Sequence, residues 1–423
     1  MTPPRSDAGS PEAPATGAQR MPRQRPPLWL LVLITLSGTL AMHMFVPALP
    51  DAARSFGVGS AAVQGTIGIY ILGLAFGQLV YGPLSDALGR RPLLLTGLAL
   101  YAAAGLAALW APSAQALIVA RLFQALGGCA GLALGRAMVR DTTGPGEAMR
   151  ALALLNLMMM IGPGLAPVMG AGLVALGGWR MVFAALAAAG ALTLLLTWRL
   201  VPETGQPTGR MSARGLARDY LSLLRAPSFM GFAVGGGCAT TSIYAFVAAA
   251  PFILTEQLHR PVGDVGLALG LVMVGMAVGN GLTRWLSLRV SSDRLLVAGS
   301  ALSLACALGF LLLEWTGQLG FVSTVAVMGL FVVGSGLASP AALAKALAVP
   351  AHQVGAAAGL YGFTQMALGA AFTALVGWGD NPALAAATVL LGAAACGQLF
   401  IQWGLWRERQ GADADAATAR ASS

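Results

Sequence analysis

Two ionisable side chains lie within long apolar stretches of this 423-residue chain and have the chemistry to handle protons. His43 stands in AMHMFVPALP, and Arg121 stands in RLFQALGGCAG. An imidazole gains and loses a proton near neutral pH, whereas a guanidinium stays charged. Ionisable groups are costly in apolar surroundings and are functional candidates by default. We therefore expect His43 to couple to protons and Arg121 to modulate that protonation.

Both residues also have structural interpretations. A neighbouring backbone carbonyl can bond His43, a ligand can contact it, and Arg121 can either hold two helices together or bind an anion. A helix rise of 1.5 Å per residue puts both residues roughly 10 Å below the same surface, at a depth where they could face each other. Asp51, at the end of the first apolar run, is the second candidate for proton coupling, although a hydrated helix-end residue is its simpler role.

A second set of residues has the chemistry to contact an apolar ligand. Met159 lies in a run of three methionines, whose thioethers adapt to varied ligands. Three consecutive helical residues cannot all face one way, so at least one of these methionines faces lipid. The candidates for polar contacts, each divided evenly between helix packing and ligand binding, are Tyr70, Asn156, Tyr244, Tyr361 and Gln365.

The elements that must position these residues are membrane helices. With 57% hydrophobic and 10% charged residues, the chain differs from soluble domains, in which roughly a quarter of residues are charged. Its apolar runs are long enough to cross about 30 Å of hydrocarbon and lack the alternation of barrel strands. They predict an all-α membrane protein with twelve transmembrane helices. The runs lie at 28–49, 61–82, 92–111, 115–135, 151–178, 181–198, 229–255, 265–283, 295–313, 320–344, 354–379 and 382–406.

The runs form two groups of six. We predict a disordered tail at 1–27, an N-terminal half at 28–199, a linker at 200–226, a C-terminal half at 227–406 and a tail at 407–423. A shift of 202 residues lays LGLAFGQLV at 72–80 on VGMAVGNGL at 274–282, so that glycines match and Gln78 falls on Asn280. The two halves are therefore expected to be pseudo-repeats, the plan of one large class of transporters.

The basic residues predict the orientation. If the N-terminus is cytoplasmic, all but four of the 25 basic residues lie at cytoplasmic segments or span ends. Arg54, Arg180 and Arg260 fall on the outside, and Arg121 lies within a span. The net charge of +9 is thus explained by topology and anionic lipid, with no need for nucleic acid. Both termini are expected in the cytoplasm.

The sequence predicts no metal, no cofactor and no enzymatic activity. Four cysteines lie in four separate runs, without the pairing that a metal or redox site needs: Cys129, Cys238, Cys306 and Cys396. The three histidines do not form the His-Glu-x-x-His pattern of an intramembrane protease, and the only lysine, Lys345, follows an alanine and so belongs to no nucleotide-binding loop. Energy must come from a gradient.

The stretch from Gly82 to Arg91, GPLSDALGRR, is expected to be a short turn between the second and third spans. It resembles the signature loop of the major facilitator superfamily, whose aspartate and arginines lock the cytoplasmic gate. The resemblance assigns gating to Gly82, Asp86, Arg90 and Arg91.

Further motifs narrow the resemblance. GPGLAP resembles the antiporter motif, which kinks a helix at the domain interface; its residues here are Gly162, Pro163, Gly164 and Pro167. The arginine of RLFQALGGCAG is similar to the one that the superfamily places inside its fourth helix. RAMVRD and GWRMVF resemble the bicyclomycin/chloramphenicol-resistance (Bcr/CflA) drug:proton antiporters. The first span departs from that subfamily, because His43 and Phe45 stand where it usually has an aspartate and a tyrosine.

The resemblance implies a proton-coupled exporter of small amphipathic antibiotics, such as phenicols or bicyclomycin-like drugs. It would work as a monomer in a bacterial inner membrane, by alternating access, with a small-molecule substrate, protons and the lipid bilayer as its only partners. A carrier of the same fold for a sugar or another metabolite is the alternative.

Overall fold

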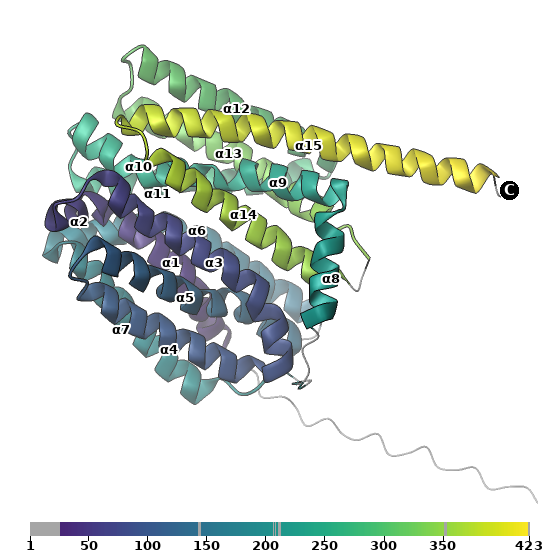
Figure 1. The fold of residues 1–423 in the computed structure, drawn as a ribbon, viewed down its shortest axis with the longest axis horizontal. Coiled ribbons are helices and arrows are strands. Elements are labelled where there is room, and N and C mark those ends of the chain that lie inside the picture. Colours follow the sequence, from purple (N-terminus) through teal and green to yellow (C-terminus); the bar gives the residue numbers. More distant parts are fainter. Residues whose placement is uncertain are drawn as a thin grey trace, which may run out of the picture.

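The computed structural model describes residues 26–142, 145–205, 207, 209, 213–350 and 353–421. Within these residues all regular elements are helical, as Figure 1 shows, so the all-α prediction is confirmed. Eleven segments of the described chain are long and apolar enough to cross a membrane. Apart from Pro26 and Pro27, the predicted tail 1–27 lies outside the described residues.

The first half contains the six predicted helices and a short outer segment. Its elements are α1 Leu28–Phe45, the 3₁₀ turn η1 Val46–Ala48, α2 Leu49–Phe56, α3 Ser60–Leu88, α4 Arg90–Leu109, α5 Ala114–Thr142, α6 Pro145–Gly177 and α7 Trp179–Leu200. In the described part of α6, Gly162–Gly177 is an apolar segment of 16 residues, shorter than the eleven candidate spans. This helix nevertheless occupies the fifth place, so the twelve-helix plan is consistent with the fold.

The second half follows the helix α8, Ala213–Leu224, which lies within the predicted linker. Its elements are α9 Pro227–Thr241, α10 Ile243–Phe252, the π-helical turn η2 Ile253–Gln257, α11 Val262–Leu286, α12 Ser292–Trp315, α13 Phe321–Ala346, α14 Val354–Val376 and α15 Pro382–Ala421. The seventh apolar run is thus divided at Ser242. Helix α15 continues well past the predicted span end at 406 and projects beyond the other helices (Figure 1).

Glycines matched by the internal repeat pack equivalently in the two halves. A Cβ atom on Gly77 of α3 would lie 2.6 Å from the Cβ of Cys129 in α5. A Cβ atom on Gly279 of α11 would lie 2.3 Å from the carbonyl oxygen of Val333 in α13. Small residues at these positions let helices approach closely in lipid. The repeat therefore preserves a helix contact as well as a sequence pattern.

The predicted turn over Gly82 to Arg91 is wrong in its extent. Helix α3 continues through Pro83 to Leu88, and only Gly89, with φ +99°, separates it from α4. That backbone conformation is readily adopted by glycine and strained for other residues. A single glycine therefore makes the turn, and Asp86 lies on a helix.

Candidate functional site

His43 lies on α1 and faces the second half. Its side chain is 5% exposed, and its Nδ1 is 2.9 Å from the carbonyl oxygen of Thr39. Because a carbonyl only accepts, Nδ1 carries the hydrogen in this bond and Nε2 is left with its lone pair in the neutral ring. The ring centroid lies 6.3 Å from that of Tyr244 on α10. His43 thus combines the backbone bond expected of a structural histidine with a second nitrogen that can take a proton.

Arg121 is fully buried and bound to α1 from α5. Its Nη1 donates to the carbonyl oxygen of Ala41 at 3.1 Å and to Oε1 of Gln124 at 2.8 Å. The aromatic rings around its guanidinium carbon are those of Tyr70, Phe45 and Phe183, with centroids at 3.9, 5.4 and 5.8 Å. In the described part of the chain no carboxylate pairs with Arg121, and its Nε and Nη2 have no hydrogen-bond partner.

The expected face-to-face contact of His43 with Arg121 is not a direct one. Both side chains reach the same level of α1, but Arg121 bonds the Ala41 carbonyl while His43 bonds Thr39. Tyr70, a predicted ligand contact, belongs to the arginine cage: its hydroxyl donates to the carbonyl oxygen of Gly38 at 2.7 Å. These contacts hold α1, α3 and α5 together within the first half.

Three other predicted ligand contacts lie in the second half. Tyr244 is half-buried and packs on Gly369 of α14, where an added Cβ would lie 2.7 Å from its ring. Gln365 of α14 donates from Nε2 to the hydroxyl of Thr240 on α9. Tyr361 is buried, and within the described ranges its hydroxyl has no hydrogen-bond partner. Tyr244 is therefore the member of this group that contacts His43.

The remaining candidates are Met159 and Asn156 on α6 and Asp51 on α2. The sulfur of Met159 lies 3.0 Å from Nη2 of Arg136, so this thioether accepts a hydrogen bond within the first half. The side chain of Asn156 lies outside the described residues. Asp51 accepts a 2.9 Å hydrogen bond from the backbone N–H of Trp179 and lies 3.6 Å from Arg54. Asp51 thus binds the start of α7, as expected for a helix-end residue.

The antiporter motif lies where α6 passes between α1 and α11. A Cβ on Gly162 would lie 2.8 Å from the side chain of Leu36 on α1, and one on Gly164 would lie 3.7 Å from Met273 on α11. One turn further along α6, the carbonyl oxygen of Pro167 lies 2.8 Å from the Cβ position of Gly266. Pro163 and Pro167 both stand inside the helix. The motif therefore joins the two halves.

Two of the other predicted gating residues, Asp86 and Gly82, lie around Arg90. Its guanidinium contacts Asp86 at 2.6 Å and Asp141 of α5 at 3.0 Å, and it also donates to the hydroxyl of Ser85. Arg90 is only 14% exposed, whereas Asp86 is 60% exposed. The Ser85 hydroxyl in turn donates to the carbonyl oxygen of Gly82.

Arg91 points elsewhere. It donates through Nη2 to the carbonyl oxygen of Trp198 on α7 at 2.8 Å. Arg91 therefore connects the start of α4 to the end of α7. Its proposed role in the gate is separate from that of Arg90.

Glu203 completes this cluster and was missed by the sequence analysis. Its carboxylate accepts hydrogen bonds from the backbone N–H groups of Arg90 at 2.9 Å and Arg91 at 3.1 Å. It thereby caps the start of α4, where a negative charge is favourable. A separation of 112 residues hides the contact, and the only signal in the sequence was a lone acid after the sixth span.

The second half has a corresponding cluster, in which a lysine on α13 and an aspartate on α12 stand where the first half has an aspartate on α5 and an arginine on α4. Lys345 at the end of α13 lies 2.7 Å from Asp293 at the start of α12 and 2.7 Å from Glu408 on α15. In the repeat, α12, α13 and α15 correspond to α4, α5 and α7. From the sequence, Lys345 is expected only to add to the cytoplasmic charge and to exclude a nucleotide-binding loop, because none of the three residues is close to another in sequence.

The halves touch on both sides of the middle of the spans. At the end that carries α2, Nε2 of Gln64 lies 3.4 Å from the carbonyl oxygen of Ala248. Toward the end that carries the Arg90 cluster, a Cβ atom on Gly359 of α14 would lie 3.4 Å from the carbonyl oxygen of Gln78, and the rings of Phe76 and Phe363 lie 5.6 Å apart nearer the middle. Among the described residues no group of three or more ligating side chains forms a metal site.

Comparison with known proteins identifies the family. The model of the Major Facilitator Superfamily matches residues 31–374. Multidrug resistance protein D of Escherichia coli is 29% identical over 345 residues, covering 80% of this chain and 85% of that protein. The bicyclomycin resistance protein homolog of Haemophilus influenzae is 26% identical over 348 residues, covering 82% and 87%. These relatives confirm the resemblance to drug-resistance proteins that the motifs indicate.

A solved structure shares the fold. The bacterial homolog of the human lysosomal transporter Spinster, in an inward-facing and occupied conformation, has a TM-score of 0.71 at 13% identity, covering 90% of this chain and 96% of that one. The family match, the paired six-helix halves and the motif between them all lead to one conclusion. The chain belongs to the major facilitator superfamily of membrane transporters.

Proposed function

We propose that this transporter exports small amphipathic antibiotics, of the phenicol or bicyclomycin kind, in exchange for protons. The observation that carries the proposal is the contact between His43 and Tyr244, which places the one imidazole of the described spans at the junction of the halves. The names of two relatives, a bicyclomycin resistance protein homolog and a multidrug resistance protein, support the substrate class.

His43 is the proposed proton carrier. Its Nδ1–H is held by the Thr39 carbonyl, so a proton enters and leaves at Nε2. The resulting positive charge lies in the same half as the buried guanidinium of Arg121, so His43 takes up a proton only when water reaches its ring. A substrate that occupies the Tyr244 side displaces this water, so proton uptake and substrate occupancy oppose each other, as exchange requires. Asp51 is the less favoured carrier, because its carboxylate is committed to the backbone of Trp179.

The proposed substrate site lies between the halves, around Tyr244 and Gln365. Tyr361 adds a buried hydroxyl that has no hydrogen-bond partner among the described residues. Met159 and Asn156 remain proposed contacts from α6. Tyr70 contributes indirectly, since its ring and hydroxyl are taken up by Arg121 and Gly38. The scarcity of charge suits neutral or weakly charged compounds.

Alternating access follows from the two sets of contacts between the halves. We place the Arg90 cluster, with Asp86 and Gly82, on the cytoplasmic side of a bacterial inner membrane, with both termini cytoplasmic and the protein acting as a monomer. The boundaries 28–199 and 227–406 then mark the two bodies that rock about the motif at Gly162 to Pro167. Each end opens when its contacts separate while the other end stays closed.

The test is substrate-induced collapse of a pH gradient in inverted vesicles, with chloramphenicol, florfenicol and bicyclomycin. Wild type should respond, and His43→Asn should bind drug without releasing protons. His259→Asn is the matched control, because His259 is exposed on the loop after η2. An equal response from His43→Asn would exclude His43 as the carrier. No response from wild type would favour a metabolite carrier of the same fold.

A further inference from the structure

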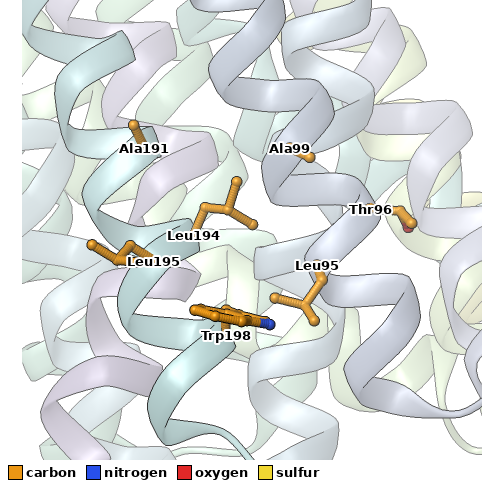
Figure 2. A pocket seen from close by; sticks show the side chains of 7 residues that line it. All are labelled: Leu95, Thr96, Ala99, Ala191, Leu194, Leu195 and Trp198. Carbon is orange, nitrogen blue, oxygen red and sulfur yellow. The ribbon is translucent and has the colours of Figure 1, made fainter.

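A groove on the outside of the first half shares no residue with the proposed substrate site. It lies between α4 and α7 and has a volume of about 510 Å³. Its walls are entirely apolar apart from one threonine: Leu95, Thr96, Ala99, Ala191, Leu194, Leu195 and Trp198. Figure 2 shows Trp198 and Leu95 facing each other across the gap. The Thr96 hydroxyl bonds the carbonyl oxygen of Leu93, so the groove offers its occupant no free polar group.

Two arginines extend this groove at one end only. On α4, Arg91, Leu95 and Ala99 are spaced by four residues and therefore share one helix face. On α7, Ala191, Leu195 and Arg199 have the same spacing. Because α4 begins where α7 ends, both guanidinium groups lie at the same end of the groove.

Both guanidinium groups have N–H donors available for a further hydrogen bond. Nη2 of Arg91 is held by the Trp198 carbonyl, while its buried Nε has no hydrogen-bond partner among the residues that the structure describes. Arg199 is exposed and, in the described part of the chain, has no ion pair. Glu203, the nearby acid, has both carboxylate oxygens engaged by backbone N–H groups of α4. The local charge therefore favours an anion.

We propose that this groove binds one anionic phospholipid, with an acyl chain between α4 and α7 and the phosphate at Arg91 and Arg199. Trp198 lies between the two parts, at the level where amphipathic rings favour the membrane interface. Under the orientation proposed above, the lipid comes from the cytoplasmic leaflet. The site depends on the membrane fold and not on the transported substrate.

A second groove provides the control. It lies between α4 and α5, has a volume of about 530 Å³ and is lined by apolar residues that include Ala103 and Phe123. No basic residue is among its lining residues. Ala99 and Ala103 are exposed residues one helical turn apart on α4, so a tryptophan at one position fills one groove and leaves the other open.

The experiment uses delipidated full-length protein in detergent, supplied with dioleoyl-phosphatidylglycerol and dioleoyl-phosphatidylcholine, and counts retained lipids by native mass spectrometry. The wild-type protein should retain one phosphatidylglycerol molecule in preference to phosphatidylcholine. Arg199→Gln should reduce that preference roughly fivefold, the usual contribution of one basic residue near an anionic headgroup. Ala99→Trp should reduce retention, and Ala103→Trp should not.

Equal retention of the two lipids by wild type would overturn the proposal, as would unchanged retention by both Ala99→Trp and Arg199→Gln. Equal loss in Ala99→Trp and Ala103→Trp would also overturn it, because general lipid coating would then explain the binding. Arg199→Gln alters an exposed side chain and keeps the test valid if the tryptophan variants fold poorly. Lipid retention requires no transport, so failure here is distinct from failure of the proposed export.

Discussion

The hydroxyl of Tyr220 donates a hydrogen bond to the carbonyl oxygen of Leu79, with the two oxygens 3.1 Å apart. Leu79 stands four residues before Pro83, whose ring nitrogen cannot supply the usual helix bond to that carbonyl. Tyr220 lies on α8, between the halves, and its hydroxyl is also 3.4 Å from the Cβ position of Gly359 on α14. The linker helix thus satisfies the carbonyl freed in α3 at the place where α3 meets the second half.

Replacing Tyr220 with Phe should favour the conformation in which α3 and α14 separate at the end that carries the Arg90 cluster. The lost hydrogen bond is worth about 1 kcal/mol, or roughly a fivefold change in the equilibrium between closed and open forms. This equilibrium would be measured as the distance between spin labels at the C-terminal end of α3 and the N-terminal end of α14. Tyr81→Phe is the control, because the Tyr81 hydroxyl on α3 makes no hydrogen bond to any residue that the structure describes. Equal distance distributions in wild type and Tyr220→Phe would refute the prediction.

The Tyr220 contact should not depend on pH in the physiological range. Burial raises the pKa of Tyr220 above its ordinary value, since it disfavours the phenolate. The protonated hydroxyl donates this bond, so the contact is fully present at low pH and is lost only as the pH rises through the raised pKa. The same label distances should therefore be constant from about pH 6 to about pH 9, below the ordinary tyrosine pKa of about 10. A transition within that range would contradict this assignment.

Asp86→Asn should abolish transport while membrane insertion stays intact. Asp86 is largely exposed and its pair with Arg90 adds little stability, as is usual for such pairs. Its proposed importance lies in gating. Substrate-driven pH collapse and the amount of inserted protein are measured together. Asp264→Asn is the control, since Asp264, in the first turn of α11, also pairs with an arginine four residues away, at 3.8 Å. Full activity of Asp86→Asn would sink the gating role.

Hydropathy and spacing predicted the level of a residue along its helix. They did not predict the direction in which its side chain points from the helix axis. The depths of His43 and Arg121 followed from the rise per residue, and both do reach the same level of α1. Their directions follow from packing, which turns the guanidinium toward the Tyr70 ring and the Ala41 carbonyl. The helix through Pro83 was missed for a related reason. A proline predicts a helix end unless a partner such as Tyr220, over a hundred residues away, satisfies the freed carbonyl.

The lysine cluster of the second half should contribute to stability through charge balance. Lys345→Met leaves the carboxylates of Asp293 and Glu408 together without a cation, although each pairs with Lys345 at 2.7 Å in the wild type. Because Lys345 is only 18% exposed, we expect a loss of about 1–2 kcal/mol, above the value of a surface pair. Thermal unfolding in detergent measures it, and the double variant Lys345→Met/Glu408→Gln should recover part of the loss. Additive losses in the double variant would argue against charge balance.

Arg121→Lys should destabilise the protein even without substrate. A lysine keeps the charge but cannot lie flat on the Tyr70 ring while it bonds both the Ala41 carbonyl and Gln124. Loss of the buried cation–π contact alone should cost about 2 kcal/mol. Arg180→Lys is the matched control, since Arg180 lies over Trp179 at 4.2 Å but is exposed, where the same contact contributes about 0.5–1 kcal/mol. If ligand-free Arg121→Lys unfolds at the wild-type temperature while drug binding is lost, Arg121 binds the ligand, and its role as a clamp between α1 and α5 is refuted.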